Sequence, residues 1–76
     1  MGPQVYQHRS IVGVFELVVS ANECELHFSG EILGIYKSTT AALHNVVTMI
    51  ASRYESDIIE SLNIPTKLSD WEKTAG

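Results

Sequence analysis

Residues 11–19 are apolar on both of the faces that a β-strand would present. The odd positions are apolar or glycine, and the even positions carry Val12, Val14 and Val18, with Glu16 as the exception. β-Branched and aromatic residues at a period of two are typical of a strand. We therefore predict a strand here, and because both of its faces are apolar we expect both to need cover.

Two shorter strands are predicted after this one. Residues 20–23 have the composition of a turn, and residues 24–28 alternate apolar and polar side chains, the pattern of a strand with one buried face. Residues 29–31 indicate a second turn before a third strand at residues 32–37. Gly34 inside that strand indicates a bulge or the close approach of another group.

Helical periodicity follows at Ser38, where Ser38, Thr39 and Thr40 are candidate N-caps. A continuous helix from Thr39 to Leu62 would be about 36 Å long, whereas the first strand spans about 30 Å. We therefore expect the helix either to overhang the sheet or to break, with Ser52 and Ser56, the latter followed by Asp57, as candidate caps for a restart. Apolar residues recur at spacings of three and four and form one stripe: Leu43, Val46, Val47, Ile50, Tyr54, Ile58 and Leu62.

These elements predict an α+β fold: a three-stranded antiparallel β-meander followed by a long or broken α-helix packed on one face, with a C-terminal tail. We expect residues 1–76 to form a single small domain in which residues 1–10 are flexible and residues 63–76 are a docked tail. Pro65 ends the helix, and Ser69 is a candidate cap for one helical turn in the tail. The predicted helix contacts with the sheet are Leu43, Val46, Val47 and Ile50.

Composition excludes several classes of function. The formal net charge is −4, which argues against a surface built to neutralise phosphates or anionic lipid. Cys24 is the single cysteine, so the chain has no internal disulfide and no multi-thiolate zinc site, and we expect a cytoplasmic location. The longest weakly charged stretch carries Lys37 and His44, so we expect no membrane span, and the first ten residues show no export signal.

No arrangement of residues predicts catalysis, a cofactor or a metal. Cys24 and His27 are expected on opposite faces of one strand, so they cannot form a thiol–imidazole pair. His8, His27 and His44 lack the spacing of metal ligands, and the carboxylates fall in expected turns and helix ends. We therefore predict no catalytic, cofactor-binding or metal-ligating residues, and a protein that is not an enzyme.

Nucleic-acid binding is also not expected. The G-x-Y-K-S-T-T-A-A string at residues 34–42, after a meander, is similar to the second half of a double-stranded-RNA-binding domain. That family begins its last helix with lysines, whereas this one begins with Ser38, Thr39 and Thr40. The five cations of the chain are scattered along it, so no phosphate-binding patch is predicted.

The even face of the first strand is the candidate interface. Val12, Val14 and Val18 are expected on the sheet face opposite the helix. Either the tail covers that face through Leu68 and Trp71, or a second copy or another protein does. Trp71, the sole tryptophan, fits an intramolecular plug and an interface anchor equally. The predicted interface residues are Val12, Val14, Val18 and Trp71.

The order of strands and helix, closing in an I-P-x-x-L-S-x-W segment, resembles small uncharacterised bacterial proteins with a similar ending. The matching residues are Ile64, Pro65, Leu68, Ser69 and Trp71, and the likeness covers residues 14–72. The resemblance implies the fold and a bacterial cytoplasmic origin, and it brings no activity, cofactor or site residue.

We expect a non-catalytic protein–protein interaction module, with a homodimer as one form, because an apolar strand face remains and no catalytic group is predicted. Its partner would be another protein or a second copy, with no membrane. The alternative is a small-ligand or nucleic-acid accessory binding protein, with its site between sheet and helix near Tyr36 and His27.

Overall fold

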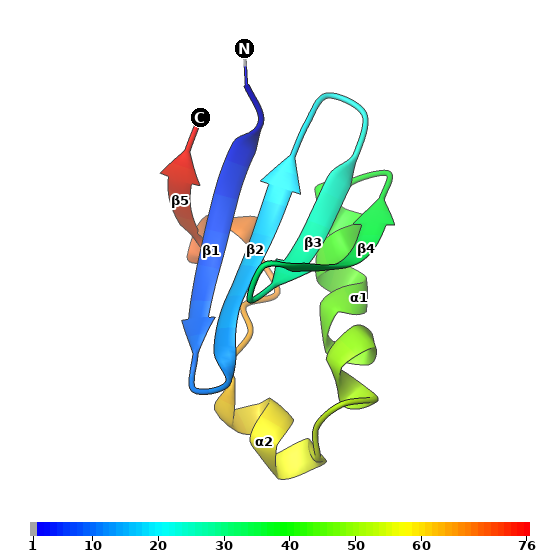
Figure 1. Ribbon diagram of the computed structural model, residues 1–76, viewed down its shortest axis with the longest axis vertical. Coiled ribbons are helices and arrows are strands. Elements are labelled where there is room, and N and C mark those ends of the chain that lie inside the picture. Colours follow the sequence, from blue (N-terminus) through cyan, green and yellow to red (C-terminus); the bar gives the residue numbers. More distant parts are fainter. Residues whose placement is uncertain (1) are drawn as a thin grey trace.

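The computed structural model describes residues 2–76 and has an α+β fold (Figure 1), which confirms the predicted class. Met1, part of the segment expected to be flexible, lies outside the described residues. A five-stranded antiparallel sheet has the strand order β4-β3-β2-β1-β5. Its strands are β1 (Gln4–Ser10), β2 (Gly13–Val19), β3 (Cys24–Phe28), β4 (Glu31–Tyr36) and β5 (Glu72–Ala75). The helical elements are α1 (Thr39–Ala51), α2 (Ser56–Ser61) and the 3-10 turn η1 (Leu68–Asp70).

The three predicted strands correspond to β2, β3 and β4, but a sheet of three was an undercount. β1 lies where we expected a flexible segment, and it pairs with β2 along its length, from Gln4 opposite Val19 to Ser10 opposite Gly13. Because β2 has an apolar inner face and a free edge, it can pair with a segment that has little alternation of its own. Gly13 has φ 149°, a conformation that favours glycine, and the turn between the strands takes up the start of the predicted first strand.

β5 is the second strand that the sequence did not predict. Its four residues are all exposed, and it pairs with β1 at the edge of the sheet, with Tyr6 opposite Lys73 and Gln7 opposite Glu72. The side chain of Thr74 donates a hydrogen bond to the carbonyl oxygen of Val5 at 3.3 Å. The end of the tail is therefore part of the sheet.

The helix begins at Thr39 as predicted, capped by Ser38, whose hydroxyl accepts a hydrogen bond from the backbone N–H of Ala41 at 3.1 Å. The apolar stripe extends to Leu62, but α1 ends at Ala51 and a separate short helix, α2, follows it. The break lets the chain change direction near the end of the sheet, where a straight helix would overhang it (Figure 1). Leu62, just after α2, then reaches the core and is 1% exposed.

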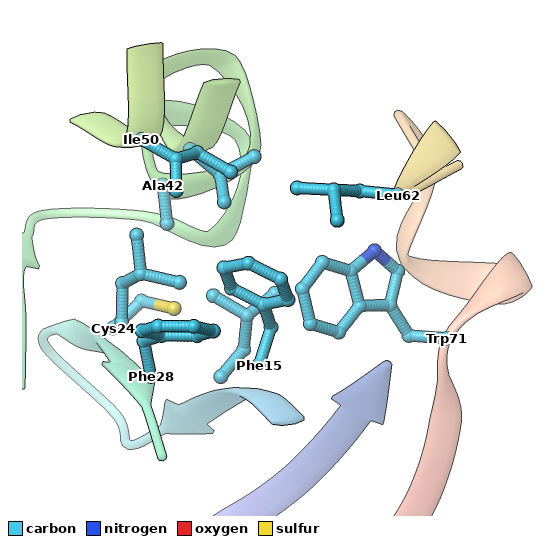
Figure 2. Close-up of a cluster of buried hydrophobic side chains, with 10 residues drawn as sticks. Phe15, Cys24, Phe28, Ala42, Ile50, Leu62 and Trp71 are labelled. Carbon is cyan, nitrogen blue, oxygen red and sulfur yellow. The ribbon is translucent and has the colours of Figure 1, made fainter. Parts of the chain in front are cut away.

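The core lies between one face of the sheet and the helices (Figure 2). At its centre the ring of Phe15 stacks on Phe28, with centroids 4.6 Å apart. Of the four residues predicted to join helix to sheet, Val47 is 42% exposed and does not, because it lies on the outer side of α1. The buried core residues are Phe15, Leu17, Cys24, Leu26, Phe28, Ala42, Val46, Ile50, Leu62 and Trp71.

Trp71 packs on the helix side of the sheet, so the expectation that the tail covers the opposite face was wrong. Its side chain is 5% exposed, its ring centroid lies 5.7 Å from that of His8, and Nε1 donates to the carbonyl oxygen of Pro65 at 3.1 Å. His8 also contacts the chain after α2, since its Nε2 lies 2.7 Å from the carbonyl oxygen of Leu62. The tail reaches the inner side because β5, which begins directly after Trp71, continues the sheet beside β1.

Replacing Trp71 by alanine should lower the free energy of unfolding by about 3–5 kcal/mol, because it leaves a large cavity between the sheet and the tail. Trp71→Phe keeps most of the ring packing and loses the hydrogen bond to Pro65, so its cost should be nearer about 1 kcal/mol. Urea unfolding followed by circular dichroism measures both. Equal midpoints for Trp71→Ala and the unaltered chain would contradict the placement of this ring.

Candidate functional site

One face of the sheet carries no helix among residues 2–76, and we call it the open face. In Figure 1 the sheet lies in front of α1, and the core residues of the helices and the tail all pack on its other side. Side chains at alternate strand positions point to the open face. They are Val5, Gln7, Arg9, Val14, Glu16, Val18, Glu25, His27, Ile32 and Ile35.

The strand register arranges these residues in rows that run across the strands. In the first row Val5 is opposite Val18, Val18 is opposite Glu25, and Glu25 is opposite Ile35. The neighbouring second row reads Gln7, Glu16, His27 and Ile32 in the same strand order. Each row therefore has an isoleucine on β4 and an ionisable residue beside it on β3.

Ile32 and Ile35 are the most exposed apolar residues of the open face, at 54% and 59%. They are three residues apart, a spacing that places side chains on opposite faces of a regular strand. An irregularity in the β3–β4 pairing, where Leu26 is opposite Gly34 but His27 is opposite Ile32, brings both to the same face. The bulge predicted at Gly34 is therefore present, and a Cβ on this glycine would lie 2.8 Å from the hydroxyl of Tyr36.

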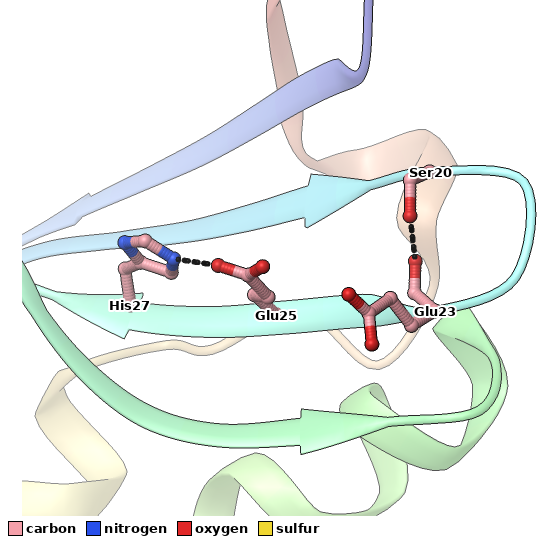
Figure 3. Close-up of polar contacts among 4 residues, drawn as sticks. All are labelled: Ser20, Glu23, Glu25 and His27. Carbon is pink, nitrogen blue, oxygen red and sulfur yellow. Dashed lines mark hydrogen bonds and ion pairs between the residues drawn. The ribbon is translucent and has the colours of Figure 1, made fainter.

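The polar centre of the open face is a pair on β3. His27 Nε2 lies 2.9 Å from Glu25 Oε1, and both side chains are partly buried (Figure 3). Glu16 is directly opposite His27 in the register of β2 and β3, so a second acidic residue is its cross-strand neighbour. At the end of the same hairpin the hydroxyl of Ser20 donates to the carbonyl oxygen of Glu23 at 3.1 Å and closes the turn.

The structure brings together only part of the predicted interface. Val14 and Val18 lie on the open face and are half-buried. Val12 lies in the turn before β2 and packs against the core, and Trp71 is buried within it. The sequence prediction missed Val5, Ile32 and Ile35. Val5 is in a segment without strand periodicity, and the two isoleucines share a face only because of the bulge.

The alternative site between sheet and helix is not assembled as predicted. Tyr36 is opposite Cys24, on the helix side, and packs against the core. His27 points to the open face, so the sheet separates the two side chains.

An open hollow with a volume of about 580 Å³ lies at the end of the sheet near the N-terminus. It is lined by Pro3, Gln4, the Ser20 turn, Val18, Glu23 and Glu25. It therefore adjoins the first row of the open face and has an acidic rim.

Two observations bear on metals and membranes. Within residues 2–76, no three His, Cys, Asp or Glu side chains lie close enough together to hold a metal ion. None of the helices in that range has the length and apolar character needed to cross a bilayer.

Comparison with protein-family models, curated proteins and solved structures gave no match to this chain. Its function is therefore inferred from its own surfaces.

Cys24 is buried on the helix side, with His27 on the other face, as the alternation predicted. Burial raises the pKa of the Cys24 thiol above its ordinary value, because the thiolate would lose its hydration. A hydrogen bond with Thr39 acts in the opposite direction and Glu25 adds to the increase. This thiol is held protonated and enclosed, the opposite of what a nucleophile needs.

Cys24 should therefore react with a thiol reagent at pH 8 at least about tenfold more slowly in the folded chain than in urea. Since the folded state holds this proton more tightly than the unfolded state, the free energy of unfolding should fall as the pH rises above about 8.5. Cys24→Ala should remove that part of the pH dependence. Equal reaction rates with and without urea would contradict the burial of the thiol.

Proposed function

We propose that this chain is a non-catalytic protein–protein interaction module that binds through the open face of its sheet. The observation that supports the proposal is that the open face exposes apolar side chains. A sheet face rich in Val and Ile normally packs against another layer, and here the helices and the tail pack on the other side. A second protein surface would supply the missing layer.

The composition of the open face fits a protein partner better than a nucleic acid. Within residues 2–76, the open face carries one arginine, Arg9, and no lysine, whereas Glu16 and Glu25 are carboxylates that would repel phosphates. The apolar residues Val18, Ile32 and Ile35 surround this polar centre, and an interface of that kind gains affinity from the apolar area and specificity from the charged groups. We place this module in the cytoplasm, consistent with a cysteine that is free and reduced.

Val14→Glu tests the proposal, because it adds a charge to the open face without touching the core. Burying an unpaired carboxylate in an interface is costly, so association should weaken at least about tenfold. Sedimentation velocity gives the solution mass, and capture of the tagged chain from cell lysate gives the partners retained.

Val47→Glu is the matched control, since it makes the same change at an exposed position on α1. Circular dichroism of both variants shows that the fold is kept. If Val14→Glu and Val47→Glu have the same solution mass and capture the same proteins as the unaltered chain, the open face is not the binding surface.

A further inference from the structure

The two rows of the open face are complementary to each other. We propose that the partner of this face is a second copy of the chain, packed face to face about a two-fold axis that crosses β3 between Glu25 and His27. The proposal rests on the proposed function and adds the identity of the partner and the geometry of the contact.

The complementarity follows from the register. The two-fold axis lies in the interface, perpendicular to the strands and midway between the two rows. Rotation about this axis places each first-row residue of one copy over the second-row residue of the same strand in the other copy. Glu25 then lies over the partner's His27, and Ile35 lies over the partner's Ile32. A carboxylate meets an imidazole, which is its opposite in charge when the ring is protonated, and an isoleucine meets an isoleucine. Each contact occurs twice, because the dimer is symmetric.

The chemistry of the Glu25–His27 pair allows this second contact. Glu25 uses Oε1 for its own His27, and a carboxylate has a second oxygen that can accept another hydrogen bond. His27 uses Nε2 for its own Glu25, and when the ring is protonated its Nδ1 also carries an N–H that can donate to the Glu25 carboxylate of the other copy. With both imidazoles protonated, two copies would form a ring of four groups with alternating charge, in which each partly buried group gains a partner.

The apolar contact covers the exposed part of the open face. Ile32 and Ile35 are 54% and 59% exposed, and they lie at the same end of their rows, so the symmetry buries all four isoleucines of the pair together. Glu16 comes over the partner's Val18, against which its aliphatic stem can pack. The carboxylate of Glu16 lowers the affinity of one copy for the other.

Pairing through the sheet edges is disfavoured. The bulge in β4 interrupts the regular hydrogen-bonding ladder that another strand would need, and bulges are one of the means by which edge strands avoid pairing. The other edge, β5, has four residues and presents the charges of Glu72 and Lys73. The edges are therefore less suited than the open face to pairing between two copies.

The area of the face sets the strength of the dimer. Four strands spaced about 4.8 Å apart and about 20 Å long give a contact of roughly 400 Å² on each copy. Two such faces total roughly 800 Å², which is below the roughly 1,200 Å² of a stable specific complex, so the dimer should be weak and transient and should form only at micromolar or higher concentrations.

Two charge changes test the predicted cross-contact. His27→Glu places two carboxylates opposite one another in its own homodimer, and Glu25→Lys replaces the acceptor of the His27 ring by a second donor, so each should weaken dimerisation at least about tenfold. An equal mixture of the two restores opposite charges at both contacts, and its heterodimer should be within about threefold of the unaltered dimer. Sedimentation velocity from about 10 μM to about 1 mM gives the affinities, and native mass spectrometry separates heterodimer from homodimers.

Glu60→Lys is the control for the change of net charge, because Glu60 is exposed on α2, away from the open face. It should leave the dimer unchanged, and circular dichroism confirms that each variant is folded. Rescue by mixing supports the two-fold contact.

Two results would overturn the inference. A dimer that Val14→Glu disrupts but mixing does not rescue would mean that the open face binds in another geometry, and the proposed function would stand. A chain that is monomeric over the whole range would exclude the second copy as partner, and the proposed function would then depend on capture with Val14→Glu alone.

Discussion

The packing of Phe15 is the contact on which the rest of the fold depends. Its ring is fully buried, stacks on Phe28 of the neighbouring strand and lies 6.5 Å from the ring of His8 on the other side. His8 in turn contacts Trp71, which belongs to the tail. One residue of β2 therefore connects both neighbouring strands and the C-terminal segment into a single apolar cluster (Figure 2). Because all of this packing lies on one side of the sheet, the other side is left without a layer of its own.

Sequence patterns predicted the elements whose side chains alternate or recur strongly. β2 and β3 have apolar residues at a period of two, β4 is a short apolar run after a turn, and α1 begins where hydroxyl residues precede an apolar stripe. β1 and β5 could not be found in this way. Most residues of β1 are polar, and all four of β5 are exposed, so these segments are strands because a paired neighbour satisfies their backbone groups. Strand pairing depends on the whole sheet, and a short stretch of sequence does not show which segments will pair.

The candidate site was predictable to the same extent. Val14 and Val18 belong to a regular strand, so their shared face followed from the alternation alone. Trp71 was ambiguous, because a large amphipathic ring in a polar tail fits both a core and an interface, and only the position of β5 decides between them. Ile32 and Ile35 needed the bulge, since one extra residue in a strand reverses the faces of everything beyond it.

The pairing of β1 with β5 also has a consequence for how the chain folds. The bond from Thr74 to Val5 joins positions 69 residues apart, and the two ends of the chain lie at the same end of the sheet (Figure 1). The hairpins β1–β2, β2–β3 and β3–β4 close over short turns, whereas this pairing closes a loop of almost the whole chain. Local contacts form faster than distant ones. We therefore expect β5 to dock late in folding, with the edge of β1 open to other strands until it does.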